Sequence, residues 1–389
     1  MDSLKTILTR VDEEEIISLT QELIQVDTVN PPGNEAGAAA IIARKLEQAG
    51  IDVKTQKLAD NRANIIGIIK GSGEKPALLF NGHLDTVPPG KESWEYSPFS
   101  GQIADGRIYG RGASDMKSGL AALVLAACIL KKSGIELKGD LIVAGTAGEE
   151  VDSLGARAFV EAGYLDNVGN IVIAEPSNLK LFTCQKGALW LEFTAIGRTA
   201  HGSMPDLGEN AILIMNKFLN SLTKYEFDYS PHSLLTAPTI NVGTINGGVK
   251  TNVVPDQCVL TLDLRTIPGQ SHDLIINDLT AMFEQCLSNK DKGKIRILNN
   301  REPIEIDPYH PLVITAQKVG REVLSLVLEP AGVNYYTDAS VLVKEKNVPV
   351  ILFGPGDEKL AHQPNEYVEI DKLTAAVKYY IALALELLT

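Results

Sequence analysis

The chain has 389 residues, and its 36 Lys and Arg against 49 Asp and Glu give it a formal net charge of −13. This acidic excess argues against a nucleic-acid-binding protein and against docking to anionic membranes, because both partners require a basic surface. Hydrophobic residues make up 44% of the sequence, which excludes a disordered chain, and the length predicts two or more domains.

Short apolar strands alternate with longer helices in the first half of the chain. The periodicity predicts helices over 13–25 and 35–48, separated by the break Asn30-Pro31-Pro32-Gly33-Asn34. Continuous apolar strands between helices are typical of a mostly parallel sheet with helices on both faces, so we predict an α/β fold. The further elements expected here are strands over 63–69, 77–81, 140–145 and 172–174, and a helix over about 114–132.

A different pattern begins near Leu179 and continues to about Asn300. Alternating runs predict half-buried antiparallel strands over 189–196 and 259–265, with helices over 210–221 and 273–287. The α/β pattern then returns with a helix over 312–324, a strand over 349–353 and a helix from Lys372. We therefore predict a catalytic domain made of residues 1–178 and 300–389, with an inserted α+β domain made of residues 179–299.

Targeting and redox features favour a cytoplasmic protein. Residues 1–9 contain no sustained apolar run, and the apolar stretch 120–130 is too short to span a membrane. The four cysteines lie far apart and form no CxxC pair, so we expect buried reduced thiols rather than a disulfide framework.

Acidic and histidine side chains recur where an apolar strand ends or a helix begins. Taken singly, each has an ordinary explanation, such as a satisfied strand-end histidine, a helix cap or a solvated acidic loop. Ligands of parallel sheets bind beyond the carboxyl ends of the strands, so together these residues predict a site there. The positions are His83, Asp85, Asp115, Glu149, Glu150, Glu175 and His362.

Five of these residues form a donor set for metal ions. Two imidazoles and three carboxylates are N and O ligands suited to zinc, cobalt or manganese. A bridging carboxylate would hold two metal ions about 3.5–4 Å apart, the spacing of hydrolytic two-metal sites. Asp85 could then hold the second ring nitrogen of the neighbouring histidine, and Glu149 stays free as a general base. The expected ligands are His83, Asp115, Glu150, Glu175 and His362.

Several motifs resemble those of the M20 metallopeptidase family. They occur in the family's order over nearly the whole chain, and they are most similar to the branch that contains acetylornithine deacetylase and succinyl-diaminopimelate desuccinylase. The motifs are Gly82-His-Leu-Asp-Thr-Val-Pro-Pro-Gly90, Tyr109-Gly-Arg-Gly-Ala-Ser-Asp-Met-Lys-Ser-Gly119, Gly148-Glu-Glu150, Glu175-Pro176, Ala200-His-Gly-Ser-Met-Pro205 and His362-Gln-Pro-Asn-Glu366.

The resemblance implies a division of the ligands between two metal ions. His83 and Glu175 would bind one ion. Glu150 and His362 would bind the other, with Asp115 as the bridge between the two.

The remaining matches imply catalytic and substrate-binding roles. Asp85 would orient the histidine ligand beside it, and Glu149 would take a proton from the metal-bridging water and pass it to the leaving amine. His201 would stabilise the tetrahedral oxyanion in the site of the neighbouring subunit, which makes the protein a homodimer and the insert its dimerisation domain. Asn252 and Arg265 would bind substrate, Arg265 as a carboxylate clamp; a turn residue and an exposed strand arginine are the alternatives.

The expected activity is hydrolysis of a linear amide bond with two divalent metal ions per subunit, either zinc or, as alternatives, cobalt or manganese. We expect removal of an N-acyl group from an amino acid, with a small N-acyl amino acid or a dipeptide as the substrate. Within the branch we favour a desuccinylase of amino-acid biosynthesis. Acetylornithine deacetylase, aminoacylase, metallocarboxypeptidase and dipeptidase activities stay open. A non-catalytic binding protein is the alternative from another class, and Glu149 argues against it, because a binder needs metal ligands but no base.

Overall fold

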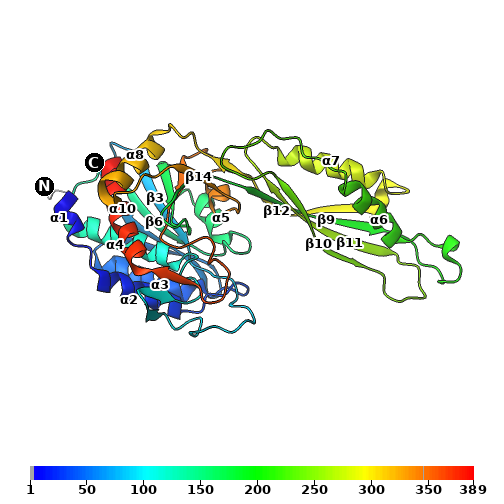
Figure 1. Ribbon diagram of the computed structural model, residues 1–389, viewed down its shortest axis with the longest axis horizontal. Coiled ribbons are helices and arrows are strands. Elements are labelled where there is room, and N and C mark those ends of the chain that lie inside the picture. The colour runs from blue at the N-terminus through cyan, green and yellow to red at the C-terminus, as the bar shows by residue number, and fades with distance from the viewer. Residues whose placement is uncertain (1–3, 345) are drawn as a thin grey trace. The chain divides into compact units, whose positions relative to one another are not determined.

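The computed structural model describes residues 4–344 and 346–389. Its chain divides into two compact units, which are described in turn (Figure 1). The first unit contains the residues up to Thr183, together with 306–332 and 337–389. The second unit contains residues 184–305 and 333–336.

A mixed sheet forms the centre of the first unit. Its strands lie in the order β1-β2-β6-β3-β7-β15-β8. The neighbours β6, β3, β7 and β15 are parallel, whereas the strands on either side of them are antiparallel. The predicted α/β class is confirmed, with the parallel order confined to the central strands. The strands are β1 (Asp52–Ala59), β2 (Arg62–Ile69), β3 (Ala77–His83), β6 (Leu141–Thr146), β7 (Val168–Ile173), β15 (Val350–Leu352) and β8 (Leu181–Gln185).

Helices cover both faces of this sheet, as the apolar strands predicted (Figure 1). Helix α3 packs on one face, where Gly67 of β2 approaches Leu46. Helix α5 lies on the opposite face, where the Asn64 amide donates to the carbonyl of Gly155 at 2.9 Å. Helices α4 and α10 pack on each other and on β3. The helices are α1 (Leu4–Leu8), α2 (Glu13–Gln25), α3 (Glu35–Gln48), α4 (Lys117–Ser133), α5 (Leu154–Glu161), α8 (Pro311–Val319), α9 (Ala339–Leu342) and α10 (Ile370–Leu388), with a π-helical turn over Gly320–Leu324.

The segment before α4 differs from the prediction. Residues 111–116 form successive turns, so the helix begins at Lys117 instead of near residue 114, and Asp115 lies ahead of it. The helix is buried along most of its length and ends at Gly134, whose φ of 71° suits a glycine cap. The turns follow strand β5 of a small sheet in the order β16-β5-β4. Its strands are β4 (Gln102–Ala104), β5 (Arg107–Tyr109) and β16 (Tyr367–Glu369).

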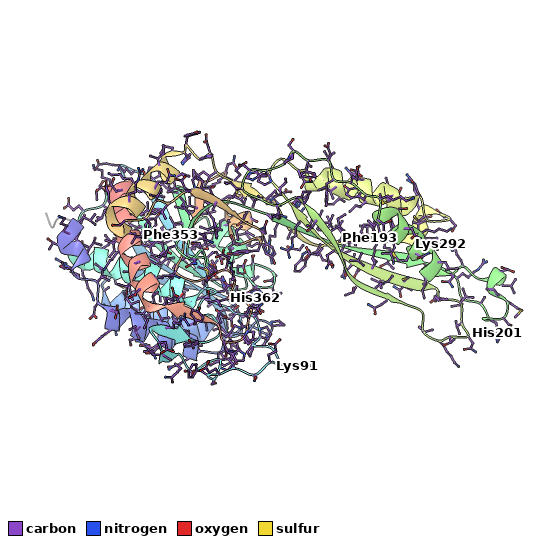
Figure 2. The ribbon with its side chains drawn as sticks, viewed as in Figure 1. Lys91, Phe193, His201, Lys292, Phe353 and His362 are labelled. Atoms are coloured by element: carbon purple, nitrogen blue, oxygen red, sulfur yellow. The ribbon has the colours of Figure 1, made fainter. Side chains whose placement is uncertain are left out.

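The second unit is a two-layer α+β sandwich. Its four strands are antiparallel in the order β10-β11-β9-β12, and helices α6 and α7 pack against the sheet. Phe193, which Figure 2 labels, meets Phe218 and Phe283 in its core, with ring centroids 4.7 to 5.2 Å apart. The elements are β9 (Gly187–Ile196), α6 (Ala211–Leu222), β10 (Thr239–Gly247), β11 (Gln257–Thr266), α7 (His272–Glu284) and β12 (Gly293–Arg301), with 3₁₀ turns over Pro205–Leu207 and Lys290–Lys292.

The observed division between the units lies a few residues from the predicted boundaries. The chain enters the second unit after Thr183 and leaves it after Glu305, and residues 333–336 also cluster with that unit. The difference arises because β13 (Ile304–Glu305) pairs antiparallel with Gln185 and Cys184 at the end of β8, so the two segments that connect the units pair with each other. Strand β14 (Pro330–Val333) pairs with β8 as well.

Two further features bear on the sequence-based expectations. Across the ranges that the structure describes, no helix is both long and apolar enough to cross a membrane. None of the four cysteines, which all lie in the described part of the chain, forms a disulfide, and Cys128, Cys184 and Cys258 are buried. Burial raises the pKa of the Cys128 thiol to about 11, which keeps it protonated and unreactive at neutral pH.

Candidate metal centre

The carboxyl ends of three neighbouring parallel strands carry the acidic and histidine residues singled out above. Strand β3 ends at His83, and the loop after β6 carries Glu149 and Glu150. Glu175 follows β7 by two residues. Because β6, β3 and β7 are adjacent and parallel, these ends lie at one edge of the sheet, where α/β proteins bind their ligands.

Two groups of side chains could each hold a metal ion there. One group consists of His83, Asp115 and Glu175, and the other of Asp115, Glu150 and His362. Within each group the candidate ligand atoms lie within 4.8 Å of one another. The structure therefore brings all five expected ligands together, with Asp115 shared by both groups.

Individual distances show how the shared carboxylate faces both groups. Oδ1 of Asp115 lies 3.0 Å from Nε2 of His83, and Oδ2 lies 3.5 Å from Nε2 of His362. The latter nitrogen also lies 3.1 Å from Oε2 of Glu150. Figure 2 labels His362 in the loop between β15 and β16, where the chain adopts a φ of 65°. Each oxygen of Asp115 thus points to a different histidine, as a bridging ligand requires.

The donor set fits two divalent cations. Oε1 of Glu150 is buried and has no hydrogen-bond partner, and burial of an unsatisfied carboxylate oxygen is costly. Imidazole nitrogens and carboxylate oxygens at this spacing are the ligands that zinc, cobalt and manganese accept. A cation bound between these side chains would satisfy the orphaned oxygen and offset the negative charge of the cluster.

The cluster shifts the protonation of its own members. Burial, together with the charge of Glu175, raises the pKa of the Glu149 carboxyl well above its usual range. Burial and the charge of Asp115 do the same to the pKa of Glu175. Burial opposes the protonation of His83, but the hydrogen bond to Asp115 and the nearby carboxylate of Asp85 raise the pKa of this imidazole overall. Without metal ions, these raised pKa values favour the protonated forms of the three side chains.

Glu149 is buried at the centre but belongs to neither ligand group. Its neighbour Glu150 is a member of one group, so two consecutive carboxylates take different environments. Such a carboxylate beside two cation sites is suited to proton transfer, because burial raises its pKa and so favours its ability to hold a proton.

The carboxylate of Asp85 makes contacts that differ from the expected one. Nδ1 of His83 bonds to the backbone carbonyl of Asp85 at 3.0 Å, while the Asp85 carboxylate is 3.6 Å away. The carboxylate accepts hydrogen bonds from the backbone N–H groups of Gly148, Glu149 and Glu150 at 3.0 to 3.2 Å. Asp85 thus fixes both the histidine ligand and the loop that carries the two glutamates.

The other three expected site residues lie in the second unit. His201 is exposed, with Nδ1 2.8 Å from the Ser203 hydroxyl. Asn252 lies beside it, because its carbonyl accepts the Gly202 N–H at 2.9 Å.

Arg265 is already paired with a carboxylate of its own unit. Its guanidinium donates from Nε and Nη2 to the two oxygens of Asp263, at 2.9 and 3.0 Å. Trp190 donates to Asp263 as well, and the Tyr336 ring lies 5.6 Å from the guanidinium carbon. The guanidinium of Arg265 thus binds a carboxylate through its planar fork, and that carboxylate is the side chain of Asp263.

Sequence reasoning gave no role to two groups at this centre. Arg111 and Glu366 form a buried ion pair whose carboxylate also accepts backbone N–H groups of the Asp115 segment. The sequence signal for this pair is Glu366 itself, the last residue of the His362 motif. The second group is Asp338, which is buried and accepts a hydrogen bond from the Thr146 hydroxyl at 2.7 Å.

The fold and the site together define the class of this protein. It is an α/β protein whose sheet edge gathers nitrogen and oxygen donors for two adjacent metal ions, an arrangement typical of metal-dependent hydrolases. A model of the family described as Peptidase family M20/M25/M40 matches residues 79–386. This match covers most of the chain, so the chain belongs to this family of hydrolases, and the resemblance drawn from the motifs is confirmed.

Relatives and solved structures agree with the family. The chain is 32% identical to the probable succinyl-diaminopimelate desuccinylase of Staphylococcus aureus (strain MRSA252) over 94% of this chain and 95% of that protein. Its structure is similar to an M20 family metallo-carboxypeptidase from Sulfolobus solfataricus, with a TM-score of 0.78, 21% identity, and coverage of 95% and 98%. The structure is also similar to a dinuclear metal-binding M20 peptidase of Bacillus subtilis. The TM-score is 0.74, with 18% identity and coverage of 99% of each chain.

Proposed function

We propose that this protein is a dinuclear-metal amide hydrolase that removes an N-acyl group from an amino acid. The observation that carries the proposal is the position of Glu149, buried beside two ligand groups that share Asp115 and part of neither. A protein that only captured a ligand would need the metal donors but no additional buried carboxylate. The M20 relatives named above support the same class of reaction.

The centre would divide the chemistry between the metal ions and the protein. When bound, the two cations lower the pKa of a coordinated water and polarise the scissile carbonyl. His83 and Glu175 would hold one cation, and Glu150 and His362 the other, with Asp115 between them. Zinc is the first candidate, with cobalt or manganese as alternatives.

Proton transfer is the task of Glu149. Its buried carboxylate would take a proton from the attacking water and give it to the nitrogen of the leaving amine. Asp85 serves this step indirectly, because its hydrogen bonds to the backbone of residues 148–150 hold the base in place. A general base of this kind contributes about 10²- to 10⁴-fold to the rate.

We assign substrate binding to residues of the second unit. His201 would donate to the oxyanion as charge develops there, in the site of a partner subunit, and Asn252 beside it would contact substrate. Arg265 would bind the substrate carboxylate through its planar fork, in exchange for Asp263. The second unit thereby acts as a dimerisation domain, and exposed apolar side chains on it, Leu207, Leu213 and Val249, are available for that contact.

The substrate that we favour is N-succinyl-LL-diaminopimelate. Support comes from the Staphylococcus aureus relative, a probable succinyl-diaminopimelate desuccinylase. Acetylornithine deacetylase, aminoacylase, carboxypeptidase and dipeptidase activities use the same centre, so only the substrate-binding residues separate them.

Parallel kinetics would test the proposal. Metal-free protein would be assayed alone and with Zn²⁺, Co²⁺ or Mn²⁺ on N-succinyl-LL-diaminopimelate, N-acetylornithine and several dipeptides. We expect metal-dependent turnover, and E149A should lower kcat about 10²- to 10⁴-fold while it still binds metal. E161A, at an exposed helix position, serves as the matched control. Absence of turnover on every substrate with every metal, or an E149A variant as active as wild type, would contradict the proposal.

A further inference from the structure

A buried ion pair lies beneath the centre and outside both ligand groups. Nη1 of Arg111 donates to Oε2 of Glu366, and the side chains of the two residues are 2% and 0% exposed. Burial of an ion pair costs about as much desolvation energy as the attraction returns, so such a pair contributes little to stability on its own. Stability alone therefore does not explain why this ion pair is buried here.

The second oxygen of Glu366 is bonded to the backbone that carries the bridging ligand. Oε1 accepts the N–H groups of Gly112, Ser114 and Asp115 at 3.1, 2.7 and 2.9 Å. These residues form turns rather than a helix or strand, so their N–H groups have no regular backbone acceptors. A single carboxylate oxygen therefore determines the path of the backbone into Asp115.

Arg111 connects Glu366 to two other segments of the chain. Its Nη1 donates to the carbonyl of Gln363, next to the ligand His362, at 3.3 Å. Its Nη2 donates to the carbonyl of Pro88, in the loop that follows strand β3, at 3.3 Å. The guanidinium also lies 5.2 Å from the Trp94 ring centroid. The pair thus joins three chain segments, and each of them supplies or follows a candidate ligand.

We propose that Glu366 and Arg111 are positioning residues of the metal centre, which hold Asp115 and His362 at the separation that two metal ions require. This inference rests on the proposed function, since it assumes that these two side chains bind metal. Residues that orient ligands in this way typically change metal affinity by about 10- to 100-fold when they are replaced.

A matched pair of variants would test the role. E366A removes the acceptor of three N–H groups and the partner of Arg111. E366Q keeps an oxygen for the N–H groups but turns an amide N–H₂ toward the guanidinium. The control is E369A, because Glu369 pairs with Arg107 between β16 and β5, at 3.9 Å and with side chains about one-third exposed.

The experiment measures Co²⁺ binding to metal-free protein. Titration calorimetry gives the affinity, and visible absorption reports the environment of the bound Co²⁺. Far-UV circular dichroism and Tm would show which variants are folded. We expect E366A to bind Co²⁺ about 10- to 100-fold more weakly than wild type, with an altered spectrum at equal folded content, and E366Q to lie between the two. E369A should match wild type in affinity and spectrum.

The outcomes separate the two hypotheses. If wild type binds two Co²⁺ ions and folded E366Q and E366A bind them with unchanged affinity and spectrum, the positioning role is overturned while the proposed function stands. If E366A does not fold, the comparison of E366Q with E369A decides in the same way. If wild type itself binds no Co²⁺, the proposed function fails, and the positioning role falls with it.

Discussion

Glu149 and Glu150 are consecutive in the chain and differ in what surrounds them. Glu150 faces His362 at 3.1 Å and joins a ligand group, whereas Glu149 joins none. The two residues lie in a turn, where successive side chains diverge, so one carboxylate can bind a cation while the other stays free. Asp85 maintains this division through its bonds to their backbone N–H groups.

Loss of the shared carboxylate should affect both metal ions at once. D115A removes a ligand from each group, so we expect the metal content after dialysis to fall from about two ions per chain to well below one. D166A, at an exposed aspartate that pairs with Lys346, is the control and should keep its metal. Metal analysis by mass spectrometry provides the measurement, and two tightly bound ions in D115A would refute a bridging role.

The protonation of the metal-free centre predicts an unusual pH dependence of stability. His83 has a raised pKa in the folded protein, so its contribution is fully present below 6.5 and is lost as the pH rises through the folded value. Glu149 and Glu175 also have raised pKa values, so their ionisation destabilises the fold as the pH rises above 4.5. Asp85 has a lowered pKa, and its contribution is lost only below 3.8.

We therefore expect the Tm of metal-free protein to be higher at about pH 5.5 than at about pH 8. Zn²⁺ should reduce or reverse the difference, because metal binding replaces the protons. Differential scanning fluorimetry in the presence of a chelator measures this. The variant E175Q, which has one fewer buried acid, should show a smaller pH dependence. If the Tm of the metal-free protein rises toward pH 8, the raised pKa values assigned to His83, Glu149 and Glu175 are contradicted.

At the scale of secondary structure, the approach of α4 to the end of β7 positions Glu175. A Cβ built on Gly119, in the first turn of α4, would lie 2.1 Å from the carbonyl oxygen of Ala174. That oxygen belongs to the backbone and cannot rotate away. The absence of a side chain at residue 119 is therefore a condition for the position of the ligand that follows Ala174.

G119A should consequently destabilise the protein and weaken metal binding. The clash forces the helix or the strand end to move, at a cost of about 1–3 kcal/mol in the free energy of unfolding. G37A in helix α3 is the matched control, because its nearest neighbour is a methyl group of Val26 at 3.1 Å and alanine favours a helix. Urea denaturation and Zn²⁺ titration of both variants measure the effect, and equal stability of G119A and wild type would show that the contact relaxes freely.

Helices and buried strands were the elements that the sequence predicted best. The helices over 13–25 and 35–48 were confirmed with their bounds, because apolar periodicity and the Pro-Pro-Gly break both mark them. Strands β1, β10 and β12 were missed, since they are edge strands with mostly exposed side chains and carry little apolar signal. The start of α4 was wrong because the turns ahead of it follow hydrogen bonds to Glu366, a residue about 250 positions away in the chain.

Within the site, too, some features could be predicted from the sequence and others could not. Side chains at strand ends could be foreseen, because the parallel sheet sets where those ends lie. The partners of Asp85 and Glu366 could not be foreseen, because they are backbone N–H groups that every residue possesses. The pairing of Arg265 with Asp263 depends on side-chain rotamers, about which the pattern of the strand says nothing.

At the scale of the whole molecule, the second unit is the part to which we assign dimerisation. Its helix α6 exposes Leu213 at 60%, and the nearby loops expose Leu207 and Val249 at 64% and 84%. Exposed apolar side chains gathered on one domain are typical of surfaces that bind another protein. A second copy of the chain is the partner that our proposed role for His201 requires.

Light scattering coupled to gel filtration would test this assignment. We expect wild type at micromolar concentration to have about twice the 42.0 kDa of the chain, and L213D to shift toward the monomer, because a buried charge opposes association. V327D, at an apolar residue of the first unit that is 73% exposed, is the control and should stay dimeric. A monomeric wild type would contradict the dimer and the role of His201 across it.

The pairing of β8 with β13 has a consequence for protein engineering. The chain leaves and re-enters the first unit at adjacent points, because the N–H of Ile306 donates to the carbonyl of Thr183 at 3.0 Å. A turn of a few residues could therefore join these two positions in place of residues 184–305, which form most of the second unit. The same junction would accept a foreign domain with neighbouring termini, so the inserted segment is the part of the chain that can be exchanged.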